Sequence, residues 1–204
     1  MIIAIEGIDG AGKSTLIATL REQLAADVIA FPRYDTSIHA QLIRQALYQQ
    51  MGDLTDSVYG MATLFALDRY EARDLLRPFS SSPDVVILDR YVASNAAYSW
   101  ARTQDATIVD WVANLEFEQL GLPRPNLQIL LNTTPDIAGQ RAINREQTDA
   151  SQARDSYESN PSLQQRTAAA YGKLAARNWQ SPWLIINPES DQTHVADRIT
   201  AALQ

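Results

Sequence analysis

The hydrophobic pattern along the chain contains four short apolar runs that predict buried β-strands. They cover Ile2–Ile5, Asp84–Leu88, Leu127–Leu131 and Trp183–Ile186, and Asp27–Phe31 is a weaker fifth. The runs are rich in Ile, Val and Leu and are apolar on both faces, which is typical of strands in a parallel sheet that helices cover on both sides.

Stretches with helical periodicity lie between these runs. In the first of them, Leu16, Leu20 and Leu24 recur at four-residue spacing. The predicted helices are Ser14–Ala25, Ser37–Gln50, Asp56–Leu76, Thr107–Leu120, Leu163–Asn178 and His194–Leu203. Alternating strands and helices indicate βαβ units. We therefore expect an α/β fold with one domain over residues 1–204, about five parallel strands and helices on both faces of the sheet.

One polar segment, Asn144–Asp155, lacks apolar periodicity and predicts a mobile loop. Open parallel sheets bind ligands at the carboxyl ends of their strands. Residues that carry chemistry should therefore follow the predicted strands directly.

Composition narrows the possible chemistry. The 204 residues are 46% apolar, which is enough for one sizeable core, and cysteine is absent, which excludes disulfides and thiolate sites. The two histidines are far apart, so no zinc site is expected. A formal charge of −7 without a basic run argues against a nucleic-acid surface.

The first residues run straight into a strand pattern, and no apolar run reaches membrane-spanning length. We therefore expect no secretory signal, no membrane association and a cytoplasmic location.

The segment after the first predicted strand, Gly7–Ser14, fits the P-loop pattern and opens a helix. Its glycines let backbone N–H groups turn towards a polyphosphate, and the helix N-terminus adds partial positive charge. Lys13 supplies an ammonium group for the phosphates and Ser14 a hydroxyl for Mg²⁺. The residues expected around ATP are Gly7, Gly10, Ala11, Gly12, Lys13, Ser14 and Thr15.

A second motif resembles a Walker B strand, because Val85–Leu88 is apolar and ends in Asp89. A carboxylate beside the P-loop serine typically holds Mg²⁺. The alternative is a helix N-cap aspartate.

Three arginines suit an acceptor that carries its own phosphate. Arg33 follows the second strand, Arg90 follows Asp89, and Arg69 lies four residues after Phe65 on one face of a predicted helix. A guanidinium group grips two phosphate oxygens and stays charged. The alternative for each arginine is a solvated surface position or a structural ion pair. The alternative for Phe65 is a position in the core.

At these residues the chain resembles the bacterial thymidylate kinase family, most closely the actinobacterial type. The segment Glu6–Thr15 is similar to the family's P-loop, and Asp89–Ser99, which reads DRYVASNAAYS, is similar to its signature. Three shorter blocks follow the family order: Phe31–Tyr34, Phe65–Arg69 and Arg154–Glu158.

The resemblance implies roles on the base and sugar side of a dTMP acceptor. Phe65 would stack on thymine, and Arg69 and Asn95 would hydrogen-bond its edge. Tyr98 would crowd the sugar 2′ position, and Asp9 would contact the 3′-hydroxyl.

The resemblance also implies a phosphate side, and it implies that the polar segment Asn144–Asp155 would be a lid that closes over ATP. Arg33, Tyr34 and Arg90 would hold the acceptor phosphate. A cis bond between Phe31 and Pro32 would position Arg33, but trans is the commoner form and is the one we expect. Asp155 and Tyr157 would lie near the base or sugar. The residues expected around Mg²⁺ are Ser14, Asp89, Asp9 and Glu158.

Gly10 stands where some family members carry an arginine, so another cation must stabilise the transferred phosphoryl group. Arg141 and Arg145, four residues apart on a helix leading into the polar segment, are candidates; a solvated helix face is the alternative. Thr148 and Gln152 stand where closely similar members carry more arginines. The sequence therefore does not decide which residue supplies the catalytic cation.

The implied reaction is ATP + dTMP giving ADP + dTDP, in a homodimer typical of the family. A deoxynucleoside kinase would need a carboxylate base for a hydroxyl, where this chain has Arg33 and Tyr34. A GTPase switch would carry an Asn-Lys-x-Asp box, which the chain lacks.

Overall fold

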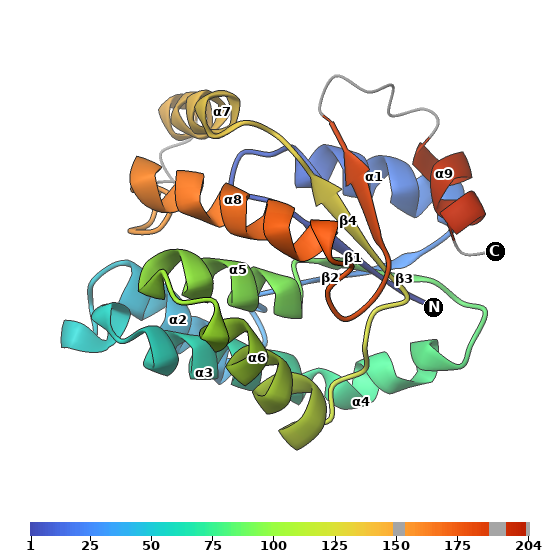
Figure 1. Ribbon diagram of the computed structural model, residues 1–204, viewed down its shortest axis with the longest axis horizontal. Coiled ribbons are helices and arrows are strands. Elements are labelled where there is room, and N and C mark those ends of the chain that lie inside the picture. The colour runs from blue at the N-terminus through green and yellow to red at the C-terminus, as the bar shows by residue number, and fades with distance from the viewer. Residues whose placement is uncertain (149–153, 188–194, 203–204) are drawn as a thin grey trace.

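Five parallel strands form the centre of the computed structural model, which describes residues 1–148, 154–187 and 195–202 (Figure 1). The strand order is β2-β3-β1-β4-β5. The strands are β1 (Ile2–Glu6), β2 (Asp27–Ala30), β3 (Val86–Asp89), β4 (Leu127–Leu131) and β5 (Trp183–Ile186). The predicted α/β class and all five strands are confirmed.

Burial follows position in the sheet. Every residue of β1 and β4 is buried, because helices cover both faces of the central strands. The edge strand β2 is mostly exposed, which explains why its sequence pattern is the weakest of the five.

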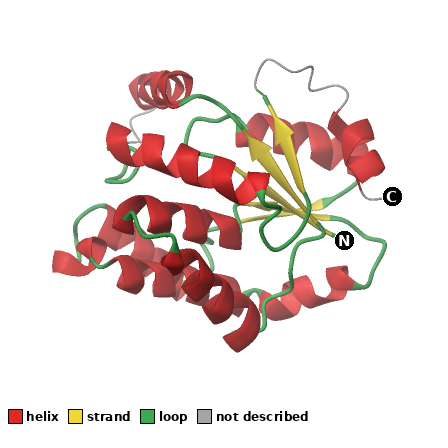
Figure 2. Cartoon of the chain, in the orientation of Figure 1, coloured by secondary structure: helices red, strands yellow, loops and turns green. Residues whose placement is uncertain are grey.

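Helices lie on both sides of the sheet, with α1 and α9 on one side and α5 and α8 on the other (Figures 1 and 2). Their bounds are α1 (Lys13–Leu24), α2 (Ile38–Leu47), α3 (Val58–Glu71), α4 (Arg73–Leu76), α5 (Val92–Thr103), α6 (Thr107–Ala113), α7 (Pro135–Thr148), α8 (Pro161–Ala176) and α9 (Val195–Ala202). Short helical turns add η1 (Gly52–Asp56), η2 (Arg77–Ser80) and the π-helical η3 (Asn114–Gln119). No helix within these described ranges is long and apolar enough to cross a membrane.

The structure corrects the predicted elements in three places. The stretch Asp56–Leu76 divides into α3 and α4 at Ala72. Helix α5 is not among the helices predicted from the sequence, although eight of its twelve residues are buried. Helix α7 continues to Thr148, so residues 144–148 are helical and not a loop. Residues 149–153 of that predicted loop lie outside the described residues.

The sheet order places the carboxyl ends of β1 and β3 side by side. Parallel register pairs Ile5 of β1 with Asp89 of β3, so the loop after β1 and the turn after β3 leave the same edge of the sheet. This edge holds the candidate site.

Candidate active site

One cavity of about 550 Å³ lies at the carboxyl edge of the sheet and collects residues from distant parts of the sequence. Its walls come from the loop after β1, the end of β2, helices α3, α5 and α7, and the turn before α8. Eighteen of the predicted site residues line it: Asp9, Gly10, Gly12, Lys13, Ser14, Phe31, Tyr34, Phe65, Arg69, Asp89, Arg90, Asn95, Tyr98, Arg141, Arg145, Asp155, Tyr157 and Glu158. Gly7, Ala11, Thr15 and Arg33 are the predicted residues that do not line it.

The loop after β1 has the backbone that its glycines predict. Gly7, Gly10 and Gly12 all have positive φ angles, of 146°, 77° and 100°, which side-chain-bearing residues rarely adopt. Lys13 begins α1 and its Nζ donates to the carbonyls of Gly7 and Ile8 at 3.3 and 3.1 Å. Burial, reinforced by the charge of Arg90, lowers the pKa of Lys13 to about 8.

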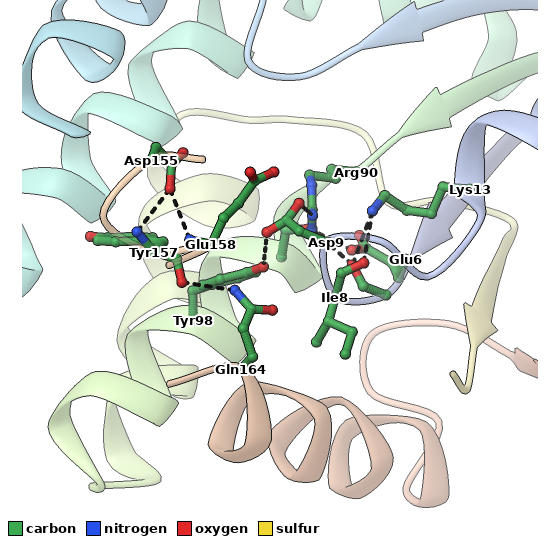
Figure 3. Close-up of polar contacts among 12 residues, drawn as sticks. Glu6, Ile8, Asp9, Lys13, Arg90, Tyr98, Asp155, Tyr157, Glu158 and Gln164 are labelled. Carbon is green, nitrogen blue, oxygen red and sulfur yellow. Dashed lines mark hydrogen bonds and ion pairs between the residues drawn. The ribbon is translucent and has the colours of Figure 1, made fainter. Parts of the chain in front are cut away.

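Asp9, Arg90 and Tyr98, which all line the cavity, form a polar cluster (Figure 3). Arg90 Nη2 forms an ion pair with Asp9, and the Tyr98 hydroxyl donates to Asp9 Oδ2 at 2.7 Å. Burial raises the pKa of Asp9, but Arg90 and Lys13 outweigh it and lower the pKa to about 2. The cluster therefore presents an ionised carboxylate beside a guanidinium group.

A buried carboxylate that sequence reasoning missed supports Arg90 from behind. Glu6, the last residue of β1, is fully buried and accepts hydrogen bonds from Ser94 Oγ at 2.6 Å and from the Tyr171 hydroxyl at 3.0 Å. Arg90 Nη1 donates to Ser94 Oγ and to the Gly7 carbonyl, at 3.3 and 2.9 Å. Burial raises the pKa of Glu6.

Phe65, Arg69 and Asn95 all line the cavity, as the family resemblance implies. The structure adds Glu116 of η3, which lies behind Arg69 and Asn95 and is fully buried. Arg69 donates to both carboxylate oxygens of Glu116, at 2.5 and 2.8 Å. Burial lowers the pKa of Arg69, but Glu116 outweighs that effect and the pKa rises.

Arg33 points away from the cavity in this structure. Its Nε donates to Asp68 Oδ1 at 3.1 Å, and its Nη2 donates to Glu71 Oε2 at 2.9 Å. The adjoining Phe31–Pro32 bond is cis, contrary to the expectation from the sequence. Tyr34, by contrast, lines the cavity.

Helix α7 lies directly against the loop after β1. Arg141 Nη1 donates to the Ala11 carbonyl at 3.4 Å, and a Cβ atom on Gly10 would lie 2.1 Å from the Ala138 carbonyl oxygen. One turn further along α7, Arg145 Nη2 donates to both carboxylate oxygens of Glu158, at 3.0 and 2.9 Å. Both predicted arginines thus face the cavity.

The turn before α8 forms part of the cavity wall. Asp155 Oδ1 accepts hydrogen bonds from the backbone N–H groups of Tyr157 and Glu158, at 2.8 and 2.9 Å (Figure 3). The Tyr157 ring stacks on Tyr98 with centroids 5.9 Å apart. Arg102, which sequence reasoning missed, also lines the cavity and donates to the Tyr157 hydroxyl.

The residues predicted around Mg²⁺ include a buried acceptor atom without a hydrogen-bond partner. Asp89 Oδ1 is buried and has no partner among the described residues, and both Asp89 and Ser14 line the cavity. An unpaired carboxylate oxygen and a hydroxyl on the wall of one cavity fit a hard cation such as Mg²⁺. Among the residues described, no group of three or more carboxylates or histidines forms a cage of its own.

Known proteins resemble the chain over nearly its whole length. A sequence model of the family described as thymidylate kinase matches residues 5–204. A thymidylate kinase of Mycobacterium tuberculosis is 47% identical and covers 96% of this chain and 95% of its own. A probable thymidylate kinase of Archaeoglobus fulgidus is 32% identical over 71% of this chain and 70% of its own.

A solved structure extends the likeness to the fold. The thymidylate kinase of Candida albicans superposes with a TM-score of 0.74 at 21% identity, over 98% of this chain and 89% of that one. The match to the family's own sequence model, which covers all but the first four residues, places this chain in the thymidylate kinase family.

Proposed function

We propose that this chain transfers the γ-phosphate of ATP to dTMP, giving ADP and dTDP for dTTP synthesis, at the cavity described above. One observation carries the proposal. The lysine of the P-loop and the group Phe65, Arg69 and Asn95 line the same cavity, with Arg90 among its lining residues. A donor site and an acceptor site that share one cavity suit direct transfer between two nucleotides.

The P-loop binds the donor. Backbone N–H groups from Gly7 to Thr15 and the N-terminus of α1 surround the ATP phosphates, and Lys13 pairs with their charge. Lys13 now donates to two carbonyls of its own loop, so it exchanges those bonds for phosphate oxygens when ATP binds.

Ser14 and Asp89 would hold Mg²⁺, and Asp9 and Glu158 also line the cavity. The unpartnered Asp89 oxygen supports this assignment. When bound, the ion neutralises charge on the ATP phosphates.

The acceptor nucleotide lies with its base against Phe65 and its polar base edge at Arg69 and Asn95. Tyr98 crowds the sugar 2′ position, and Asp9 binds the 3′-hydroxyl. Phe31, Asp155 and Tyr157 complete the wall.

Arg90 and Tyr34 hold the acceptor phosphate. The Arg33 guanidinium binds there only after it leaves Asp68 and Glu71, so its contribution requires a side-chain rearrangement. The bifurcated support of Arg90 by Ser94 and Gly7 holds it in place before the nucleotide arrives.

Transfer needs charge neutralisation and alignment more than covalent chemistry. An acceptor phosphate oxygen attacks the γ-phosphorus in line, the bond to the β–γ bridging oxygen breaks, and ADP leaves. Lys13, Arg90 and one of the α7 arginines neutralise the charge that develops. We assign this role to Arg145. Its guanidinium reaches the phosphates only after it leaves Glu158, whereas Arg141 makes one bond of 3.4 Å to the P-loop backbone.

The test follows ADP release from ATP and Mg²⁺ with dTMP, dUMP, dCMP, UMP or thymidine as acceptor. We expect rapid release with dTMP, weaker release with UMP and none with thymidine. Preference for thymidine would indicate a deoxynucleoside kinase, and slow hydrolysis that no acceptor accelerates would indicate a nucleotide switch.

Three further expectations from the sequence stay predictions: one domain over residues 1–204, a cytoplasmic location and a homodimer. Light scattering on the purified protein measures the oligomeric state directly. A mass of twice 22.7 kDa would confirm the dimer, and a mass of 22.7 kDa would exclude it.

A further inference from the structure

Behind the base end of the cavity lies a charged residue to which the proposed mechanism gives no role. The Glu116 side chain is fully buried and does not line the cavity. Both of its carboxylate oxygens accept hydrogen bonds from Arg69. Arg69 Nε donates to Oε2 at 2.5 Å, and Arg69 Nη2 donates to Oε1 at 2.8 Å. A two-point contact of this kind fixes the plane of the guanidinium group.

The same carboxylate also holds Asn95. Asn95 Nδ2 donates to Glu116 Oε1 at 2.8 Å and to the Ala62 carbonyl at 2.9 Å. Both partners only accept hydrogen bonds, so the amide can present only its NH₂ group to them. Both Asn95 N–H groups are thus used, and Oδ1, which also accepts a long bond of 3.4 Å from Ser99 Oγ, is the polar atom left to offer a nucleotide.

Arg69 and Asn95 are thereby left with opposite hydrogen-bonding character. The remaining N–H groups of Arg69 can only donate, and the remaining atom of Asn95 can only accept. Thymine presents the matching edge, an acceptor at O4 beside a donor at N3–H. Cytosine presents the reverse, a donor at N4 beside an acceptor at N3.

We propose that Glu116 is a positioning residue that fixes Arg69 as donor and Asn95 as acceptor, and so makes the site select thymine over cytosine. This inference rests on the proposed function, since it assigns the base edge of the acceptor to Arg69 and Asn95.

The local backbone supports a specific placement of this glutamate. Helix α6 gives way to the π-helical segment η3 at Asn114, and π-helical turns occur frequently at functional sites. Within that segment Glu116 is fully buried, whereas Glu118 is exposed and pairs with Arg124. A buried ion pair is costly to desolvate, so a pair that served stability alone would have little advantage over apolar packing.

The experiment replaces Glu116 by glutamine. Glutamine has the same shape, but it is uncharged and replaces one acceptor oxygen by an NH₂ donor. At least one of the three hydrogen bonds that Arg69 and Asn95 donate to the carboxylate is therefore lost. We expect the ratio of kcat/KM for dTMP to kcat/KM for dCMP to fall by at least about tenfold. The KM for dTMP should rise more than kcat falls, because the lost orientation affects binding of the base.

Glu118→Gln is the matched control. It removes a carboxylate from the same segment, two residues away, on the solvent side. We expect it to keep the wild-type ratio of dTMP to dCMP.

The outcomes separate the two proposals. If Glu116→Gln lowers activity on dTMP and dCMP equally, Glu116 is only structural and the inference is overturned. If the wild-type chain does not phosphorylate dTMP at all, the proposed function fails first.

If the Glu116→Gln protein shows no cooperative melting transition, it has not folded. The structure of the wild-type complex with dTMP then tests the role of Glu116. We expect a crystal structure of that complex to keep Glu116 bonded to both Arg69 and Asn95 while these two residues contact O4 and N3. A carboxylate that has released either partner would refute the inference.

Discussion

Replacing Gly10 by alanine tests whether α7 lies on the P-loop during turnover. A Cβ atom at this position would meet the Ala138 carbonyl oxygen at 2.1 Å, and contacts below 3.0 Å are essentially never seen. The P-loop and α7 must therefore separate by about 0.9 Å. Because both partners are backbone, no side-chain rotation relieves the contact.

Two effects follow from that geometry. The φ angle of 77° at Gly10 costs an L-residue about 1–2 kcal/mol, which corresponds to a melting temperature lower by about 2–8 °C for a chain of this size. A displacement of about 1 Å also carries Arg141 and Arg145 away from the phosphates. Misplacement on that scale lowers kcat/KM by about 100-fold.

The assay combines thermal melting with steady-state kinetics at varied ATP. Gly139→Ala is the control, because it lies in the same helix with no atom within 4 Å of the added Cβ. Ala is favoured over Gly inside a helix, so that variant should melt slightly higher and keep its kinetics. A Gly10→Ala enzyme with wild-type kcat/KM would refute the placement of α7 on the P-loop in the working enzyme.

Three other changes test the site. Arg145→Ala should lower kcat by about 100-fold while the dTMP KM changes little, since this guanidinium is assigned to the charge that develops on transfer; an unchanged kcat in steady-state assays would contradict that role. Burial lowers the pKa of Lys13 to about 8, and only the protonated amine pairs with ATP, so kcat/KM for ATP should fall as pH rises above about 8. A kcat/KM that stays constant up to about pH 9.5 would exclude a lowered pKa of Lys13 as a determinant of ATP binding. Tyr98→Phe removes the hydroxyl that donates to Asp9, so the preference for dTMP over ribothymidine monophosphate should drop by about tenfold; equal preference in both enzymes would remove Tyr98 from sugar selection.

The fold and much of the site could be predicted from the sequence because their signals are local. Five apolar runs, a glycine pattern and an aspartate at a strand end are each visible in short windows. Parallel order then brings the strand ends to one edge, which is why residues as distant as Ser14 and Asp89 line one cavity.

Buried polar partners were harder to predict. Glu6 and Glu116 look like ordinary charged residues, and only long-range contacts to Tyr171 and Arg69 identify their roles. A signal for Glu116 was present, since it continues the four-residue spacing of the buried Ile108 and Val112 on one helix face. Polar residues that continue an apolar face are candidates for such networks.

The position of β1 in the middle of the sheet has a consequence for synthesis on the ribosome. Its two neighbours, β3 and β4, lie about 80 and 120 residues further along the chain. At about 5–20 residues per second, β1 waits roughly 4–17 s before β3 has been made. Throughout that interval the four apolar residues of β1 have no hydrogen-bonding partner strand, and the P-loop that follows β1 lacks the neighbouring strands that hold its ends in place. Nascent chains that end before Asp89 should therefore depend on chaperones and bind no nucleotide, although they contain the complete P-loop sequence.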